Sequence, residues 1–262
     1  MSSADPHKTI LMLWCVPRSS STAFEKAFQQ RVDMTLLHEP FTDSYYFSNQ
    51  SRNNRYGAYA GLENHSGGFV ENNILNHSGR ALFVKELAFQ AVPYVTREFI
   101  GRASHSFLIR NPEQVYHSLI KIKPDFTDEE FGFTALAELF ERVKEFSPET
   151  PYVIDAENLC AWPKITLREY CDHFGLEFSE DMLRWKPGPI REWKPHEVQS
   201  QAQWHKTLEQ STGILPQTEH VAPVKPEYRD MIDTALRIFE RLLSEGRRRP
   251  ESLMDAYQPA AQ

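Results

Sequence analysis

The feature that most constrains the fold is an apolar run of eight residues near the start of the chain, at 9–16. Its sequence, TILMLWCV, shows no alternation of polar and apolar side chains. A strand formed from such a run has to be buried on both faces. Strands of this kind are typical of parallel sheets that are covered by helices on both sides, so the run predicts an α/β fold.

The rest of the chain alternates between short apolar runs and helical patterns. Further strands are predicted at 34–37, 81–84, 106–109 and 152–154. Helices are predicted at 22–30, after Pro112, and at 131–146, 164–174 and 227–245. Strands that alternate with helices form a mostly parallel sheet with helices on both faces, and we expect a single domain over 1–262.

Three segments lack these patterns. We expect a flexible amino terminus at 1–8 and a flexible carboxyl-terminal tail at 250–262. We also expect a loop or lid region at 41–80, because this segment is rich in Asn, Ser, Gly, His and Tyr. A loop of that length in a compact domain is usually functional or mobile.

Composition excludes several classes of protein. The chain has 262 residues and a formal net charge of −7, which argues against general nucleic-acid binding because that needs a basic surface. The polar amino terminus does not have the pattern of a signal peptide, and no apolar stretch approaches the ~18 residues of a membrane span. The three cysteines are interpreted as reduced thiols, and no zinc-site spacing is present. We expect a cytoplasmic protein that binds neither nucleic acid nor membrane; a homodimer stays open.

Charged side chains follow the predicted strands at the point where each strand ends. Arg18, Glu39, Lys85 and Arg110 each lie just beyond a different strand. Because the carboxyl ends of parallel strands meet at one edge of a sheet, where ligands bind, we expect these four side chains to converge on one crevice.

The segment 17–22 (PRSSST), between the first strand and the first helix, predicts an anion site. Backbone N–H groups at a helix start bind anions, four hydroxyl groups add donors, and Arg18 adds a bidentate charge. The alternative is an ordinary strand–helix turn capped by Ser or Thr. The segment has no glycine and is not a GxxxxGK[ST] sequence, which argues against an ATP or GTP hydrolase.

A second motif, Arg110-Asn111-Pro112 with Ser118 eight positions after the arginine, predicts a binding site for a second phosphate. The alternative is a capping arginine and a surface serine.

Together the two motifs resemble those of the sulfotransferases that use 3′-phosphoadenosine 5′-phosphosulfate (PAPS). The family's 5′-phosphosulfate loop has the pattern Pro-Lys/Arg-Ser-Gly-Thr/Ser-Thr, and in this chain Ser20 stands where glycine is common. The family's 3′-phosphate motif is Arg-x-Pro followed by a serine, which matches Arg110, Pro112 and Ser118. Similar stretches at 153–159 and 204–213 extend the resemblance over most of the chain.

The resemblance implies a three-layer sandwich like that of the P-loop NTPases. It implies a transferase of secondary or other small-molecule metabolism that moves a sulfonate group from PAPS to a hydroxyl or amine of a small acceptor and releases PAP, with no metal. It implies that the 5′-phosphosulfate is bound by Arg18, Ser19, Ser20, Ser21 and Thr22, and the 3′-phosphate by Arg110 and Ser118. By the same resemblance, Lys85 stabilises the departing phosphate.

Two adjacent residues, His38 and Glu39, are candidates for the general base. Cytosolic members of the family commonly use His, whereas several bacterial and Golgi branches use a Glu that often precedes a proline or aromatic residue, as Glu39 does here. We favour Glu39. In a regular strand the two side chains point to opposite faces, so we expect only one of them in the crevice. The alternatives are a half-buried His38 without a role, a Glu39 that only pairs with Lys85, and a Lys85 that only pairs with Glu86.

Two other functions stay open: a P-loop kinase of small molecules, and a relative that binds PAP without turnover. A kinase usually shows GK[ST] and a Mg²⁺-binding acid, and both patterns are missing from the sequence. Aromatic residues of the 41–80 region either line an acceptor pocket or pack within the region: Tyr45, Tyr46, Phe47, Tyr56 and Tyr59. Basic residues near the end of the family-like stretch form either a lid or a solvated face: Arg191, Lys194, His205 and Lys206.

Overall fold

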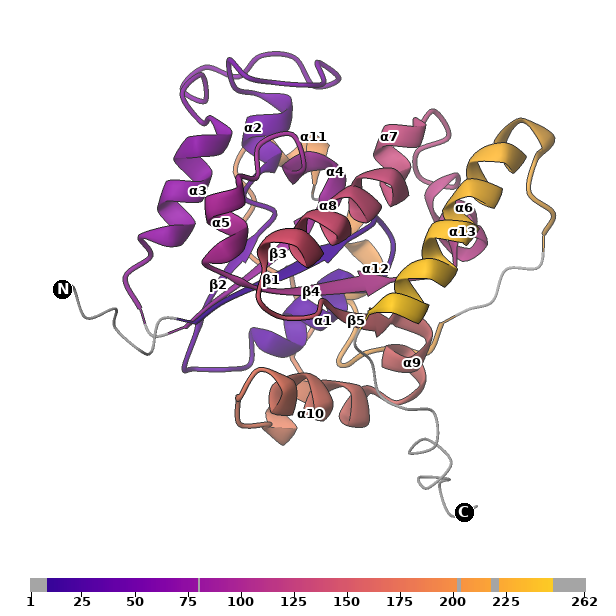
Figure 1. Ribbon diagram of the computed structural model, residues 1–262. Helices are drawn as coiled ribbons and strands as arrows, with labels where there is room; N and C mark the ends of the chain where they lie inside the picture. Colours follow the sequence, from indigo (N-terminus) through magenta and orange to yellow (C-terminus); the bar gives the residue numbers. More distant parts are fainter. Residues whose placement is uncertain (1–8, 80, 202–203, 218–221, 247–262) are drawn as a thin grey trace.

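The computed structural model describes residues 9–79, 81–201, 204–217 and 222–246 (Figure 1). The two ends expected to be flexible, 1–8 and 250–262, lie outside these residues.

A five-stranded sheet with all neighbouring strands parallel forms the centre of the molecule (Figure 1). Its order is β2-β3-β1-β4-β5, so the chain leaves β1 towards one edge and later crosses to the other. In such sheets the ligand crevice lies where the direction of winding reverses, beyond the carboxyl end of β1. The strands are β1 Thr9–Cys15, β2 Thr35–His38, β3 Ala81–Leu87, β4 Ser104–Ile109 and β5 Tyr152–Asp155.

Side chains of β1 alternate between two separate cores. Met12 and Trp14 pack in the core beneath α8 (Phe133–Phe146) and α13 (Arg229–Glu245). Leu11, Leu13 and Cys15 pack in the core formed with α1 (Ser21–Phe28) and α10 (Pro163–His173), which lies below the sheet in Figure 1. Burial of both faces explains why the run at 9–16 has no polar alternation. The predicted α/β sandwich of three layers is confirmed.

The remaining helices are short. They are α2 Thr42–Tyr46, α3 Gly67–Leu75, α4 Ala88–Ala91, α5 Arg97–Gly101, α6 Pro112–Leu119, α7 Asp128–Phe131, α9 Ala156–Ala161, α11 Glu197–Ser200 and α12 Lys206–Glu209, with 3₁₀ turns at Glu180–Leu183 and Pro226–Tyr228. Among the described helices, none is both long and apolar enough to cross a bilayer.

The prediction of a loop throughout 41–80 is wrong, because α2 and α3 lie within this segment. Tyr45, Tyr46 and Phe47 are buried and form a small aromatic core with Phe89 of α4. Aromatic side chains bury a large apolar area, which stabilises helices too short to be stable alone. A role of the segment as a lid stays a prediction.

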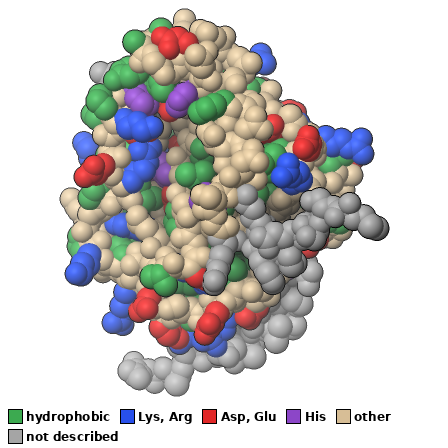
Figure 2. All heavy atoms as spheres, turned by 90° about the vertical axis from the view of Figure 1, so that its left-hand side faces the viewer, with side chains coloured by type: hydrophobic (Ala, Val, Ile, Leu, Met, Phe, Trp, Pro, Cys, Tyr) green, Lys and Arg blue, Asp and Glu red, His purple; other side chains and the backbone are tan. Residues whose placement is uncertain are grey.

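The surface charge is unevenly distributed. On the face seen in Figure 2, histidine side chains lie next to lysine and arginine side chains, although the chain as a whole carries a formal net charge of −7. The three cysteines are buried and form no disulfide.

Candidate functional site

Two adjoining cavities lie beyond the carboxyl ends of the central strands. The inner cavity, of about 80 Å³, is lined by Glu39 and Lys85. The loop cavity, of about 370 Å³, is lined by Arg110 and by Ser118 of α6. The structure thus brings the strand-end residues together. The residues that line both cavities are Arg18, Ser21, Thr22, Trp204 and His205.

The segment 17–22 makes a tight turn between β1 and α1. Among the described residues, the only non-glycine residues with a left-handed φ are Arg18 (61°), Ser20 (67°) and Glu39 (45°), and all three line these cavities. Backbone strain of this kind costs about 1–3 kcal/mol per residue and clusters at functional sites. Ser20 adopts the left-handed conformation that glycine adopts without strain, so a serine in place of the family's glycine does not prevent this turn.

The hydroxyl groups of this turn have different uses. Ser19 donates to the carbonyl oxygen of Val16 at 2.8 Å, so its hydroxyl holds the turn itself. Ser20 Oγ lies 3.6 Å from the thiol of Cys160. Ser21 and Thr22 line both cavities. All four residues line the loop cavity, but the hydroxyl groups of Ser19 and Ser20 already have contacts within the protein.

Hydrogen bonds hold the guanidinium groups of Arg18 and Arg110 at the loop cavity. Arg18 Nε donates to Ser118 Oγ at 3.0 Å, and Arg110 Nη1 donates to the carbonyl oxygen of Arg18 at 2.9 Å. Ser118 therefore contacts Arg18 rather than Arg110. Burial and the neighbouring charge of Arg110 lower the pKa of Arg18. Neither guanidinium has a carboxylate partner within the described ranges, so the charge of both groups is available to an anionic ligand.

A buried ion pair joins Lys85 and Glu39. Lys85 lies within β3, two residues before its end, and its ammonium group donates to Glu39 Oε1. Burial by itself raises the pKa of Glu39, but the charges of Lys85 and His38 lower it to about 2. Burial lowers the pKa of Lys85, and the charge of Glu39 outweighs this and raises it.

The alternative pairing of Lys85 with Glu86 does not form. Glu86 is fully buried and accepts hydrogen bonds from the backbone N–H groups of Phe41 and Leu87, each at 2.8 Å. Burial and the nearby charge of Glu39 raise the pKa of Glu86 well above its ordinary value.

The side chains of His38 and Glu39 approach each other, because Glu39 follows the end of β2 in a left-handed conformation. His38 Nε2 is 3.7 Å from Glu39 Oε1, but of these two residues only Glu39 lines the inner cavity and neither lines the loop cavity. His38 Nδ1 is 2.7 Å from Oε2 of Glu25, a buried residue of α1. Strand alternation does not apply to a residue that has left the strand.

Sequence reasoning missed the positions of Glu25 and His205. His205 is stacked on Trp193, with ring centroids 5.3 Å apart, and meets His38 edge-on. Burial and the charge of His38 lower the pKa of His205 to about 3, so its ring is neutral at pH 7. The resemblance at 204–213 pointed to this segment, but no sequence pattern gave its position between the two cavities.

Removal of the Lys85 ammonium should strongly destabilise the fold. We expect Lys85→Met to lower the free energy of unfolding at pH 7 by about 3–5 kcal/mol, because it leaves a buried carboxylate without its partner. The pKa of Glu39 is lower in the folded than in the unfolded protein, so the ion pair contributes fully to the free energy of unfolding above the unfolded pKa of about 4.3. This contribution is lost as the pH falls through the folded pKa of about 2.

Urea denaturation at pH 7 and pH 3 measures this effect. The difference in unfolding free energy between wild type and Lys85→Met should shrink at pH 3. The control is Lys144→Met, which removes an exposed ion pair with Glu245 and should change stability by less than about 1 kcal/mol. An equal loss of unfolding free energy in Lys85→Met and Lys144→Met would contradict a buried Lys85–Glu39 pair.

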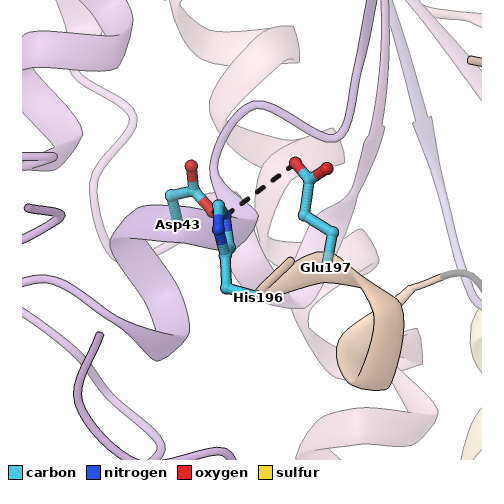
Figure 3. Close-up of side chains that lie close together, drawn as sticks. All are labelled: Asp43, His196 and Glu197. Atoms are coloured by element: carbon cyan, nitrogen blue, oxygen red, sulfur yellow. Dashed lines mark hydrogen bonds and ion pairs between the residues drawn. The ribbon is translucent and has the colours of Figure 1, made fainter. Parts of the chain in front are cut away.

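A second cluster of polar side chains joins α2 to the start of α11 (Figure 3). Asp43, His196 and Glu197 are buried and point toward one another, and His196 Nε2 lies 3.0 Å from Asp43 Oδ1. These residue types also bind metals. However, Glu197 already accepts hydrogen bonds from both terminal nitrogens of Arg191 and from the backbone N–H of Lys194. We interpret the cluster as a polar contact that holds the segment before α11 against α2.

The fold and the crevice define an α/β protein with an anion site beside a buried carboxylate–ammonium pair. A family model, the sulfotransferase domain, matches residues 9–245. The chain therefore belongs to the sulfotransferase family.

Known proteins resemble the chain over most of its length. Branched-chain-amino-acid aminotransferase-like proteins 1 and 2 of Arabidopsis thaliana are 28% and 27% identical to it over 241 and 238 residues. These matches cover 90% and 89% of this chain but only 42% and 41% of the relatives, so the chain spans less than half their length. The sulfotransferase domain from the curacin biosynthetic pathway is 16% identical with a TM-score of 0.48, covering 87% of this chain and 97% of that one.

Proposed function

We propose that the chain is a PAPS-dependent sulfotransferase of the EC 2.8.2 class, which transfers a sulfonate group to a hydroxyl or amine of a small acceptor and releases PAP. The observation that carries the proposal is the pair of adjoining cavities, one beside two guanidinium groups without carboxylate partners and the other beside Glu39 and Lys85. A cytoplasmic location and an acceptor of secondary metabolism belong to the same proposal.

The loop cavity suits the nucleotide of the donor. Arg18 and the backbone N–H groups at the start of α1 would hold the 5′-phosphosulfate. Arg110 and Ser118 would hold the 3′-phosphate, the group that distinguishes PAPS from ATP. The charges of the partly buried Arg18 and the buried Arg110 fit a ligand that carries both groups.

The inner cavity suits the acceptor. Tyr46, Tyr56 and Phe89 supply aromatic walls, and Gln90 supplies a polar group. Its border with the loop cavity, at Arg18 and the other shared residues, is where a sulfonate group would pass from donor to acceptor. Pockets of this kind bind small molecules through apolar walls and a few polar contacts.

Glu39 would remove the proton of the acceptor, and Lys85 would stabilise the leaving phosphate. The acceptor oxygen or nitrogen forms a bond to sulfur while the bond between sulfur and the phosphate oxygen breaks, and that oxygen keeps the electron pair. In the unliganded protein Lys85 depresses the pKa of Glu39. When Lys85 donates to the phosphosulfate instead, burial raises that pKa and makes Glu39 a stronger base. Positioning and electrostatics supply most of the rate enhancement.

The proposal is tested by calorimetric titration of the protein with PAP, and with ADP as control, in buffer without added metal. We expect a Kd for PAP in the micromolar range or below and at least about a ten-fold preference over ADP, because a charge-assisted hydrogen bond contributes about 1.5–3 kcal/mol. Equal binding of PAP and ADP would contradict the 3′-phosphate site and favour a P-loop kinase. Binding of PAP without sulfonate transfer to any acceptor would favour a non-catalytic relative.

A further inference from the structure

His38 occupies an unusual position between two carboxylate groups. Its side chain is about 2% exposed, with Nδ1 2.7 Å from Glu25 Oε2 and Nε2 3.7 Å from Glu39 Oε1. Nε2 is a buried atom without a hydrogen-bond partner among the residues that the structure describes. Such atoms are rare in folded proteins and each requires an explanation.

The contacts determine where the imidazole proton lies. A carboxylate only accepts hydrogen bonds, so the close contact between Glu25 and Nδ1 requires the proton on Nδ1. When the ring is neutral, its lone pair is on Nε2, which faces Glu39. Oε1 of Glu39 accepts from Lys85, so the Glu39 carboxylate donates no proton to Nε2. In this form of the ring, Nε2 is the atom able to take a proton.

We propose that Glu25 is a positioning residue that holds His38 with its proton on Nδ1, so that Nε2 receives the proton which Glu39 removes from the acceptor. This inference rests on the proposed function. In this proposal Glu39 and His38, the two candidate bases, act one after the other on the same proton.

The proton path is balanced. The acceptor proton moves to the Glu39 carboxylate as the new bond to sulfur forms, and it then moves to His38 Nε2, which restores the Glu39 carboxylate. The resulting imidazolium lies between the carboxylates of Glu25 and Glu39. The proton leaves to solvent after the products are released. The contact of 3.7 Å would have to shorten in the complex, as catalytic hydrogen bonds often do.

The charged and titratable groups around His38 come from several elements. The carboxylates of Glu25 of α1 and Glu39 after β2 face the two ring nitrogens, and Lys85 of β3 is the register partner of His38 in the sheet. His205, before α12, is neutral at pH 7 and contacts the ring edge-on.

Nitrogen-15 NMR of the whole protein tests whether Glu25 positions His38, and this measurement does not require catalysis. The His38 signals are identified by their absence in His38→Gln. In wild type we expect the neutral ring to carry its proton on Nδ1. In Glu25→Gln, whose amide can donate to Nδ1 as well as accept from it, we expect this preference for the Nδ1 proton to be lost. Glu71→Gln, which changes a buried glutamate bonded to Thr96, is the matched control and should leave the preference unchanged.

Kinetics test the proton path. In Glu25→Gln we expect kcat to fall about ten-fold or more, with PAP affinity unchanged. A proton on Nε2 of the neutral ring in wild type, or an unchanged proton position in Glu25→Gln, would overturn the positioning role. An unchanged kcat in Glu25→Gln would overturn the path. Absence of sulfonate transfer by wild type, with the NMR result as expected, would reject the proposed function and the path but keep the positioning of His38 by Glu25.

Discussion

Glu39→Gln should lower kcat for sulfonate transfer by about 10²–10⁴-fold while changing the Kd for PAP by less than about three-fold. The substitution removes the group that accepts the acceptor proton and keeps the shape of the side chain. The amide oxygen of Gln still accepts from Lys85, so the buried ammonium keeps a partner. Arg18 and Arg110 are unchanged, and the nucleotide should therefore bind as before.

Steady-state kinetics and PAP calorimetry on the same preparation measure the two quantities. Glu71→Gln, in α3 and outside both cavities, is the control for the loss of a buried carboxylate. His38→Gln is the informative companion variant. Turnover by Glu39→Gln at the wild-type rate, together with a large loss in His38→Gln, would assign the base to His38 alone.

Arg110→Ala should weaken PAP binding by about 150-fold, which corresponds to about 3 kcal/mol for the loss of one partner of a buried, charge-assisted contact. ADP has no 3′-phosphate, so its binding should change far less. The preference for PAP over ADP should therefore disappear. The effect on kcat at saturating donor should be modest, because Arg110 lies in the loop cavity and not beside Glu39.

Calorimetry with both nucleotides separates a direct contact from a disturbed loop. Arg110 also donates to the carbonyl oxygen of Arg18 and so supports the 17–22 turn. Equal weakening of PAP and ADP would show that the substitution disturbs this turn and would contradict a 3′-phosphate contact. Arg102→Ala, which removes an exposed arginine paired with Glu98, is the control and should change neither affinity.

Local sequence patterns determined the layers of the fold and the positions of two arginines in the candidate site. The continuous apolar run at 9–16 required burial on both faces, and the structure places it between two cores. The positions of Arg18 and Arg110 beyond their strands placed both at the carboxyl edge of a parallel sheet. These predictions succeeded because they depend on periodicity and on the geometry of neighbouring residues.

Only the tertiary structure decided which side chains meet. Ser118 contacts Arg18 across 100 positions, and Lys85 contacts Glu39 across 46. The left-handed conformation of Glu39 brings it beside His38, and packing of α1 brings Glu25 to the same ring. No local pattern encodes such contacts, because they depend on how separate elements pack and on where a strand ends. The sequence therefore determined the scaffold and the position of the 17–22 turn, whereas the arrangement of the groups that would move a proton was decided by packing.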